Sequence, residues 1–194
     1  MLRFDTIDDI LFIDDFLKNN INIKEFLISF NIIKNIPNFI NIFKNINLKT
    51  NGFKSIITYN TNQFQNLYAI FEIIKNNIFI SKIYLSSYKY SFLKILSECL
   101  KYNQNLKILI LINCEIKINI LIDIFKVNTS IKKLYIHECY LKYKQQSILD
   151  IFNYNNTLKF LEIKNIHSNN DTFIDNINDK IQLLKNKDIT VIIK

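Results

Sequence analysis

Two histidines and three cysteines are the residues of this 194-residue chain best suited to nucleophilic or metal chemistry: His137, His167, Cys99, Cys114 and Cys139. His137 and Cys139 stand two residues apart. At this spacing a base could activate a thiol, or both groups could hold a metal ion, provided that the side chains share a face. The odd number of cysteines, without the spacing of a disulfide framework, indicates reduced thiols. Whether His137 and Cys139 meet depends on the elements that carry them.

A nine-residue template recurs along the chain and defines those elements: apolar-x-x-apolar-x-apolar-x-x-(Asn or Cys). Its six copies begin at Ile23, Phe53, Ile80, Leu106, Ile131 and Leu158, at intervals of 30, 27, 26, 25 and 27 residues. Five copies carry an asparagine three residues before the first anchor, at Asn20, Asn77, Asn103, Asn128 and Asn155, and the second copy has Thr50 there. A regular period of this length is typical of a repeat protein.

The spacing within each copy predicts a short strand. The fourth and sixth template positions are two residues apart, so both side chains face the same side of an extended strand. Between strands the apolar residues follow helical spacing, as in Phe92, Leu93, Leu96 and Leu100. Strands alternating with helices at this interval predict a parallel sheet with helices on one face. Since one unit cannot bury its apolar face alone, neighbouring units must stack. A last strand is predicted at residues 189–193.

The composite apolar-x-x-Asn-x-x-Leu-x-x-Leu-x-Leu-x-x-Cys resembles the leucine-rich repeat family, in particular its ribonuclease-inhibitor-like and cysteine-containing branches. The resemblance covers residues 17 to 194 and implies an α/β solenoid of about six to seven repeats, with a curved parallel sheet on the concave side and helices on the convex side. Thr58, Thr61 and Ile166 depart from the template. Residues 20–194 are expected to form the array, and residues 1–19 an N-terminal capping helix that begins near Thr6.

The template places His137 and Cys139 on opposite sides of the chain. His137 falls at an outward strand position and Cys139 at the inward turn position, so we expect neither a catalytic dyad nor a shared metal site. Cys114 and Cys139 occupy equivalent positions in successive repeats, where we expect them to stack as small apolar residues of the core. The single glycine, Gly52, excludes a glycine-rich phosphate loop. The sequence therefore predicts no catalytic residue, no metal site and no cofactor.

Composition and charge favour an intracellular protein with an acidic partner. Lys and Arg number 25 against 17 Asp and Glu, which gives a net charge of +8 and favours acidic partners. Asp14 and Asp15 interrupt the first apolar stretch, so no secretory signal is expected. The apolar runs are far shorter than the ~20 residues of a membrane helix. The abundant Ile, Asn and Lys have A- and T-rich codons, as in the A+T-rich genomes of some large DNA viruses and protists. We expect a cytoplasmic or nuclear protein.

The outward strand positions predict the surface that binds a partner. The residue after the first anchor is lysine in five of the six copies: Lys24, Lys54, Lys107, Lys132 and Lys159. The residue between the paired anchors is mostly apolar or aromatic and includes Tyr84, Ile110 and Tyr135, while Tyr59 and His137 fall in an adjacent row. An exposed apolar stripe usually marks an interaction site. These residues together form the predicted concave binding face.

The predicted function is a protein–protein interaction module rather than an enzyme. Its predicted partner is a protein, of acidic character if the lysine row takes part. One alternative is a substrate-receptor subunit of a ubiquitin-ligase-type complex, which requires the first 19 residues to recruit an adaptor. Another is a polyanion or nucleic-acid binder that uses the lysine row; the presence of a single arginine, Arg3, argues against it. Neither a small-molecule substrate nor a membrane is expected as a partner.

Overall fold

The computed structural model describes residues 2–4, 25–28, 55–59, 71, 74–75, 80–142, 147–168, 181–182, 184–185 and 188–194, the first three ranges as strands without their side chains. Its main element is an eight-stranded sheet in which every pair of neighbours is parallel. Its strands, in spatial order, are β1 (Leu2–Phe4), β2 (Glu25–Ile28), β3 (Ser55–Tyr59), β4 (Lys82–Ser86), β5 (Ile108–Ile112), β7 (Lys133–His137), β9 (Phe160–Lys164) and β11 (Thr190–Ile193).

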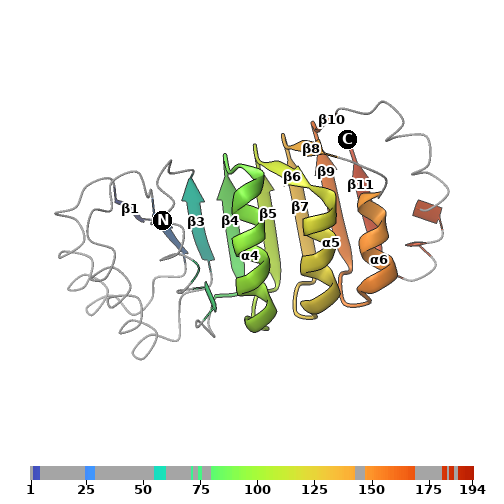
Figure 1. Ribbon diagram of the computed structural model, residues 1–194, viewed down its shortest axis with the longest axis horizontal. Coiled ribbons are helices and arrows are strands. Elements are labelled where there is room, and N and C mark those ends of the chain that lie inside the picture. Colours follow the sequence, from blue (N-terminus) through green and yellow to red (C-terminus); the bar gives the residue numbers. More distant parts are fainter. Residues whose placement is uncertain are drawn as a thin grey trace.

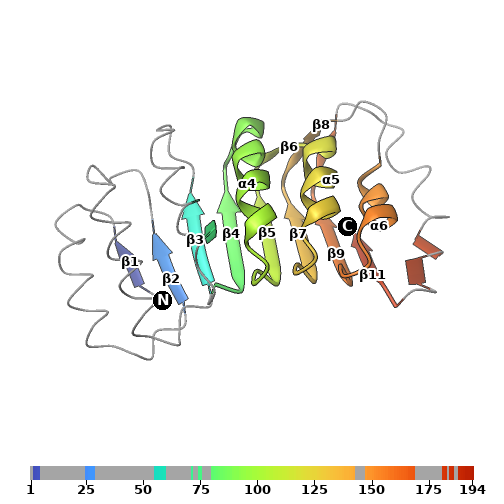
Figure 2. The ribbon, with the colours of Figure 1, turned by 60° about the horizontal axis from the view of Figure 1, so that its bottom comes forward.

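Helices cover one face of this sheet, and a second, small parallel sheet lies at the end where the long strands finish. Figures 1 and 2 both show α4 (Tyr90–Tyr102), α5 (Ile118–Val127) and α6 (Ile151–Tyr154) side by side on the same face. A 3-10 turn, η2 (Ile148–Asp150), precedes α6. The small sheet has the order β10 (His167–Ser168), β8 (Tyr140–Lys142), β6 (Glu115–Lys117). The predicted parallel α/β arrangement is confirmed.

The strand register brings equivalent template positions together. Leu109 pairs with Leu134, which pairs with Leu161, and all three are fully buried. The same alignment continues toward the N-terminus through Ile83, Ile56 and Phe26, at the level of the backbone. The inward anchors predicted for the copies at Ile80, Leu106, Ile131 and Leu158 are all buried. The final strand predicted at residues 189–193 is β11.

One strand of the sheet was not predicted. Residues 2–4 form β1, in which Leu2 pairs with Phe26 and Phe4 pairs with Ile28, so these residues join the sheet. The capping helix predicted within residues 1–19 falls on residues 5–19, outside the described residues.

Buried asparagines join each unit to the one before it. The Asn128 side-chain amide donates hydrogen bonds to the carbonyl oxygens of Leu100 and Asn103, both at 2.8 Å. Asn155 repeats the arrangement one unit later, donating to Phe125 at 2.9 Å and to the Asn128 carbonyl at 2.8 Å. Asn103 in turn donates to the carbonyl of Ile74. We call Asn103, Asn128 and Asn155 the asparagine ladder; all three are buried.

The side-chain oxygen of each ladder asparagine accepts hydrogen bonds from the backbone of the loop that leads from the helix to the next strand. Asn128 Oδ1 accepts from the backbone N–H groups of Ser130 at 3.0 Å and Ile131 at 3.1 Å. Asn155 Oδ1 accepts likewise from Thr157 at 3.0 Å and Leu158 at 2.8 Å. Buried backbone groups need such partners. The side chain therefore satisfies groups that the loop between helix and strand would leave unpaired.

Left-handed residues bend the chain after each strand. Ser87, Asn113, Glu138 and Asn165 have φ values of 63°, 50°, 54° and 49°. Glycine and asparagine adopt this conformation most readily, but none of these four positions is glycine. The bend turns the following residue inward, so Tyr88, Cys114 and Cys139 are buried in equivalent places.

Replacing Asn128 by alanine should destabilise the protein by about 3 kcal/mol or more. The change leaves two carbonyl oxygens and two N–H groups without their partner in a buried loop, and each unsatisfied group costs roughly 1–3 kcal/mol. Urea denaturation of the variant measures the loss. Thr129→Ala is the matched control, because Thr129 is exposed and such substitutions stay within about 0.5 kcal/mol. Equal stability of the two variants would show that the ladder contributes nothing.

Candidate functional site

Three rows of side chains line the face of the large sheet opposite the helices. In the register of β4, β5, β7 and β9 the rows are Lys82–Ile108–Lys133–Phe160, Tyr84–Ile110–Tyr135–Glu162 and Ser86–Ile112–His137–Lys164. We call these twelve residues the sheet face. Successive side chains of a strand point to opposite faces, so these residues alternate with the buried anchors. Figures 1 and 2 show α4, α5 and α6 on the other side, and no described helix covers the sheet face.

The centre of the sheet face is apolar and aromatic. Ile110 lies between Tyr84 and Tyr135 in the register of the strands, and is only 7% exposed. The Tyr135 ring packs against Phe160 with centroids 5.1 Å apart. Lys82 Nζ lies 4.5 Å from the centroid of the Tyr84 ring, and Lys133 Nζ lies 5.8 Å from that of Phe160. Ile110 therefore differs from the expectation of an exposed residue, because large residues stand on both sides of it.

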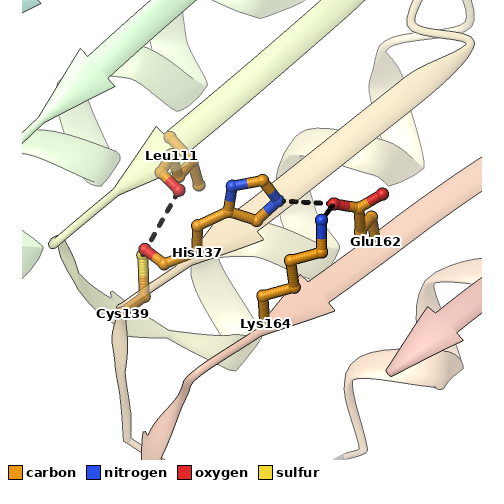
Figure 3. A network of polar contacts seen from close by, with 5 residues as sticks. All are labelled: Leu111, His137, Cys139, Glu162 and Lys164. Atoms are coloured by element: carbon orange, nitrogen blue, oxygen red, sulfur yellow. Dashed lines mark hydrogen bonds and ion pairs between the residues drawn. The ribbon is translucent and has the colours of Figure 1, made fainter. Parts of the chain in front are cut away.

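A polar network closes one end of this aromatic patch. The ring N–H of His137, at Nε2, donates to Glu162 Oε1 over 2.9 Å, and Lys164 Nζ lies 2.5 Å from the same oxygen. Figure 3 shows His137 and Lys164 converging on Glu162 from neighbouring strands. The Tyr135 ring meets His137 edge-on, at 6.0 Å and 88°. The Lys164 ion pair, with a smaller contribution from His137, holds the pKa of Glu162 below its ordinary value of 4.5.

Cys139 points away from this network, as the template predicts. Its thiol contacts the carbonyl oxygens of Leu111 at 3.5 Å and His137 at 3.2 Å, whereas the His137 ring turns toward Glu162 (Figure 3). Cys114 makes the equivalent contacts to Leu85 and Ile112, and its backbone N–H donates to the Cys139 sulfur over 3.4 Å. The contact with Cys114 and burial raise the pKa of Cys139, so it remains a thiol. His137 and Cys139 form no dyad.

The structure divides the predicted binding residues between two places. Tyr84, Ile110, Tyr135 and His137 lie together on the sheet face. Lys107, Lys132 and Lys159 are exposed but stand just before the strands, where the Lys132 N–H donates to the Lys107 carbonyl and the Lys159 N–H to the Lys132 carbonyl. Tyr59 pairs with Ser86 through the backbone, while its side chain, like Lys24 and Lys54, lies outside what the structure describes.

The template places Glu162 and Phe160 at outward strand positions, but neither was predicted as a binding residue, and Lys164 was not singled out. Glu162 and Lys164 complete the polar network with His137, and Phe160 extends the aromatic patch. In the strand register Phe160, Glu162 and Lys164 pair with Lys133, Tyr135 and His137 respectively. Glu162 therefore stands diagonal to the histidine, and a comparison of adjacent rows could have found it. Across the described residues, no group of three or more His, Cys, Asp or Glu side chains is placed to hold a metal ion. No described helix is long and apolar enough to cross a membrane.

No protein-family model and no curated protein sequence matches this chain. Solved structures do match. The tropomodulin C-terminal domain of Caenorhabditis elegans aligns with a TM-score of 0.50 and 12% identity, over 79% of this chain and 95% of that one. A structure titled leiomodin-1 actin-binding site 2 aligns with a TM-score of 0.47 and 14% identity, over 65% of this chain and 73% of that one. The likeness to the tropomodulin domain shows a shared, leucine-rich-repeat-like fold.

These neighbours correct the branch predicted from the sequence. The predicted ribonuclease-inhibitor-like, cysteine-containing branch is wrong, because the fold match at a TM-score of 0.50 is to a tropomodulin C-terminal domain. The prediction relied on cysteine at the inward turn. That position holds Tyr88, Cys114, Cys139 and Ile166 in successive units, and the first three are buried while Ile166 packs against the core. Any apolar side chain that fills the inward turn can occupy this position, so a cysteine there is not diagnostic of one branch of the family.

Cys139→Arg should destabilise the protein by about 3–5 kcal/mol, because it buries a charge with no partner. Cys139→Ala should cost much less, since it removes one small apolar group. Thermal and urea denaturation compare both with the wild type. Tyr140→Arg is the control, since Tyr140 is exposed and adjacent in sequence. If the Cys139→Arg variant had the same melting temperature as the Tyr140→Arg control, the inward placement of the Cys139 side chain would be contradicted.

The Glu162 network should make stability depend on pH in the acid range. A carboxyl whose pKa is lowered by folding stabilises the native state above its ordinary pKa, here 4.5. That contribution is lost as the pH falls through the lower pKa that the carboxyl has in the folded protein. We expect the stability difference between wild type and Glu162→Gln to shrink as the pH falls from neutral to about 3. Urea denaturation at several pH values measures it.

Lys164→Gln provides the matched comparison for this pH series, because it removes the largest cause of the lowered pKa and keeps the carboxyl. Its acid-range loss of stability should be smaller than that of the wild type. If wild type and both variants lose stability in parallel, the network has no energetic role.

Proposed function

We propose that this chain is a non-enzymatic protein–protein interaction module that binds its partner through the sheet face. The observation that carries the proposal is the patch of Tyr84, Ile110, Tyr135 and Phe160, which spans four adjacent strands on a face that no described helix covers. Contiguous apolar surface rimmed by polar residues usually marks an interaction site. Here the rim includes Lys82, Lys133 and the polar network of His137, Glu162 and Lys164.

The aromatic side chains are arranged to bind with little loss of freedom. Tyr135 is held between Phe160 and the edge of His137, and Lys82 lies against the Tyr84 ring. Side chains already fixed in place lose less rotamer entropy on association. Tyrosines that become desolvated are frequent energetic centres of interfaces. Tyr84 and Tyr135 are therefore the proposed anchors, with Ile110 as the floor between them.

The charges of the sheet face favour an acidic partner. Lys82, Lys133 and Lys164 stand against one carboxylate, Glu162, so the face carries 3 − 1 = +2 with His137 neutral. Potentials of opposite sign on two partners steer their encounter and raise the association rate. A partner with carboxylates around an apolar centre matches both features of the face.

The contacts of the described side chains give no support to catalysis on this face. His137 is engaged by Glu162, and the thiols of Cys114 and Cys139 are buried behind the sheet. A nucleophile adjacent to a base is the usual requirement of covalent catalysis. The His137 ring turns toward a carboxylate that is already paired with Lys164, so the face offers a binding surface rather than a reaction centre.

We further propose that the chain forms a leucine-rich-repeat solenoid of six to seven repeats, with residues 20–194 as one array. Supporting this count, the register continues without a break from β2 to β11. The ladder asparagines recur 25 and 27 residues apart, at Asn103, Asn128 and Asn155. In such an array the sheet face is the inner surface, which is the side that these folds commonly use for binding.

The double variant Tyr84→Ala/Tyr135→Ala should weaken binding by at least about tenfold, mainly through faster dissociation, while the protein stays folded. A photo-crosslinking amino acid at position 84 first captures the partner in its native cell. Surface plasmon resonance with the purified partner then measures both rates.

Tyr140→Ala is the control for the binding measurement, because Tyr140 is exposed and lies on the small sheet. Its binding should equal that of the wild type. A partner that binds the double variant with unchanged rates must use another surface, and the sheet-face proposal then fails.

A further inference from the structure

The end of the molecule where helices finish and strands begin carries a row of exposed large apolar residues. Helices α4, α5 and α6 end at Tyr102, Val127 and Tyr154, which are 67%, 43% and 53% exposed. Each stands directly before a ladder asparagine. The three residues therefore repeat in step with the ladder and form one stripe across successive units.

Five lysines accompany this stripe, and three of them make no ion pair with a described residue. The three connecting segments read KYNQNLK (101–107), KVNTSIK (126–132) and NYNNTLK (153–159), with five lysines and no Asp or Glu. Lys101 and Lys126 pair with Glu98 and Asp123 of their own helices, at 2.7 and 2.9 Å. Lys107, Lys132 and Lys159 are exposed and make no ion pair with any described residue. Positive charge is thus concentrated at this end of the molecule.

The backbone holds the three unpaired lysines in line. The Lys132 N–H donates to the Lys107 carbonyl over 2.8 Å, and the Lys159 N–H donates to the Lys132 carbonyl over 2.9 Å. Adjacent strands lie about 4.8 Å apart, so the row keeps like charges close together. Their repulsion opposes folding, and a ligand with several negative charges would relieve it. The adjacent loops are themselves linked, since Thr129 donates to Gln104 Oε1 over 3.3 Å.

Each tyrosine of the stripe makes a cation–π contact with a lysine. Lys75 Nζ lies 5.0 Å from the Tyr102 ring centroid, and Lys126 Nζ lies 4.9 Å from that of Tyr154. In these cation–π contacts a lysine occupies one face of each ring. A nucleic-acid base would need a ring face for stacking, whereas an extended peptide can place apolar side chains along the ring edges and Val127.

We infer that this surface is a second docking site, for an acidic segment of a protein partner. We call it the loop end and define it as Tyr102, Val127 and Tyr154 with Lys107, Lys132 and Lys159. Carboxylates of the segment would pair with the lysines while its apolar residues cover the stripe. The chain has a single arginine, Arg3, whereas surfaces that recognise phosphates bidentately rely on arginine. The inference uses no residue of the sheet face and does not depend on the function proposed for that face.

Fluorescence anisotropy with a labelled peptide of alternating glutamate and leucine tests the loop end. The full chain should bind this peptide, and higher salt should weaken the binding because exposed charges are screened. The variant Lys107→Gln/Lys132→Gln/Lys159→Gln should bind about tenfold more weakly, as expected for the loss of three exposed ion pairs. Tyr102→Ser/Tyr154→Ser should also weaken binding but retain the salt dependence.

The matched control is Lys89→Gln/Lys94→Gln/Lys185→Gln, which removes the same charge from exposed positions elsewhere. It should bind the peptide nearly as the wild type does. No binding by the wild type, or equal losses in the control and the loop-end triple variant, would overturn the inference. So would binding of single-stranded RNA or of anionic lipid vesicles in place of the peptide. Peptide binding that is lost in Tyr84→Ala/Tyr135→Ala but kept in the loop-end variant assigns the peptide to the sheet face and also overturns it.

Discussion

The asparagine ladder is the interaction on which the rest of the structure depends. In the loop between each helix and the following strand, the ladder asparagine is buried and satisfies backbone groups that are withdrawn from water. One amide side chain, such as that of Asn128, donates to two carbonyl oxygens of the preceding unit and accepts from two N–H groups of its own loop. The ladder thereby fixes the spacing of the units. Strand register, the line of lysines and the stripe at the helix ends all repeat with that spacing.

Periodic features of the fold could be predicted from the sequence because they follow from spacing alone. The buried anchors Leu109 and Leu134, the inward Cys139 and the strand β11 are where the template predicts them. Strand β1 could not be predicted in this way, since three residues are too few to display a pattern. The branch assignment failed because cysteine, tyrosine and isoleucine can each fill the inward turn, as Cys114, Tyr88 and Ile166 do.

Properties of the candidate site depend on neighbours across strands, which a single template copy does not contain. Ile110 occupies an outward position and is nevertheless buried, because Tyr84 and Tyr135 flank it on both sides. Glu162 is held by Lys164 of its own strand and by His137, which is 25 residues earlier in the sequence and lies on the neighbouring strand. Tyr102 is an aromatic residue at the end of its helix, and its 67% exposure is known only from the packed structure. Such effects require the packed structure.

The left-handed bends have a consequence for the evolvability of the chain. Ser87 and Glu138 adopt a conformation that costs on the order of 1 kcal/mol for a residue with a side chain. The protein therefore lies below the highest stability that its own backbone allows, as natural proteins generally do. Because each bend belongs to a different unit, these costs are independent and could be relieved one at a time. The sheet thus holds a distributed reserve of stability that would compensate for mutations acquired in new binding surfaces.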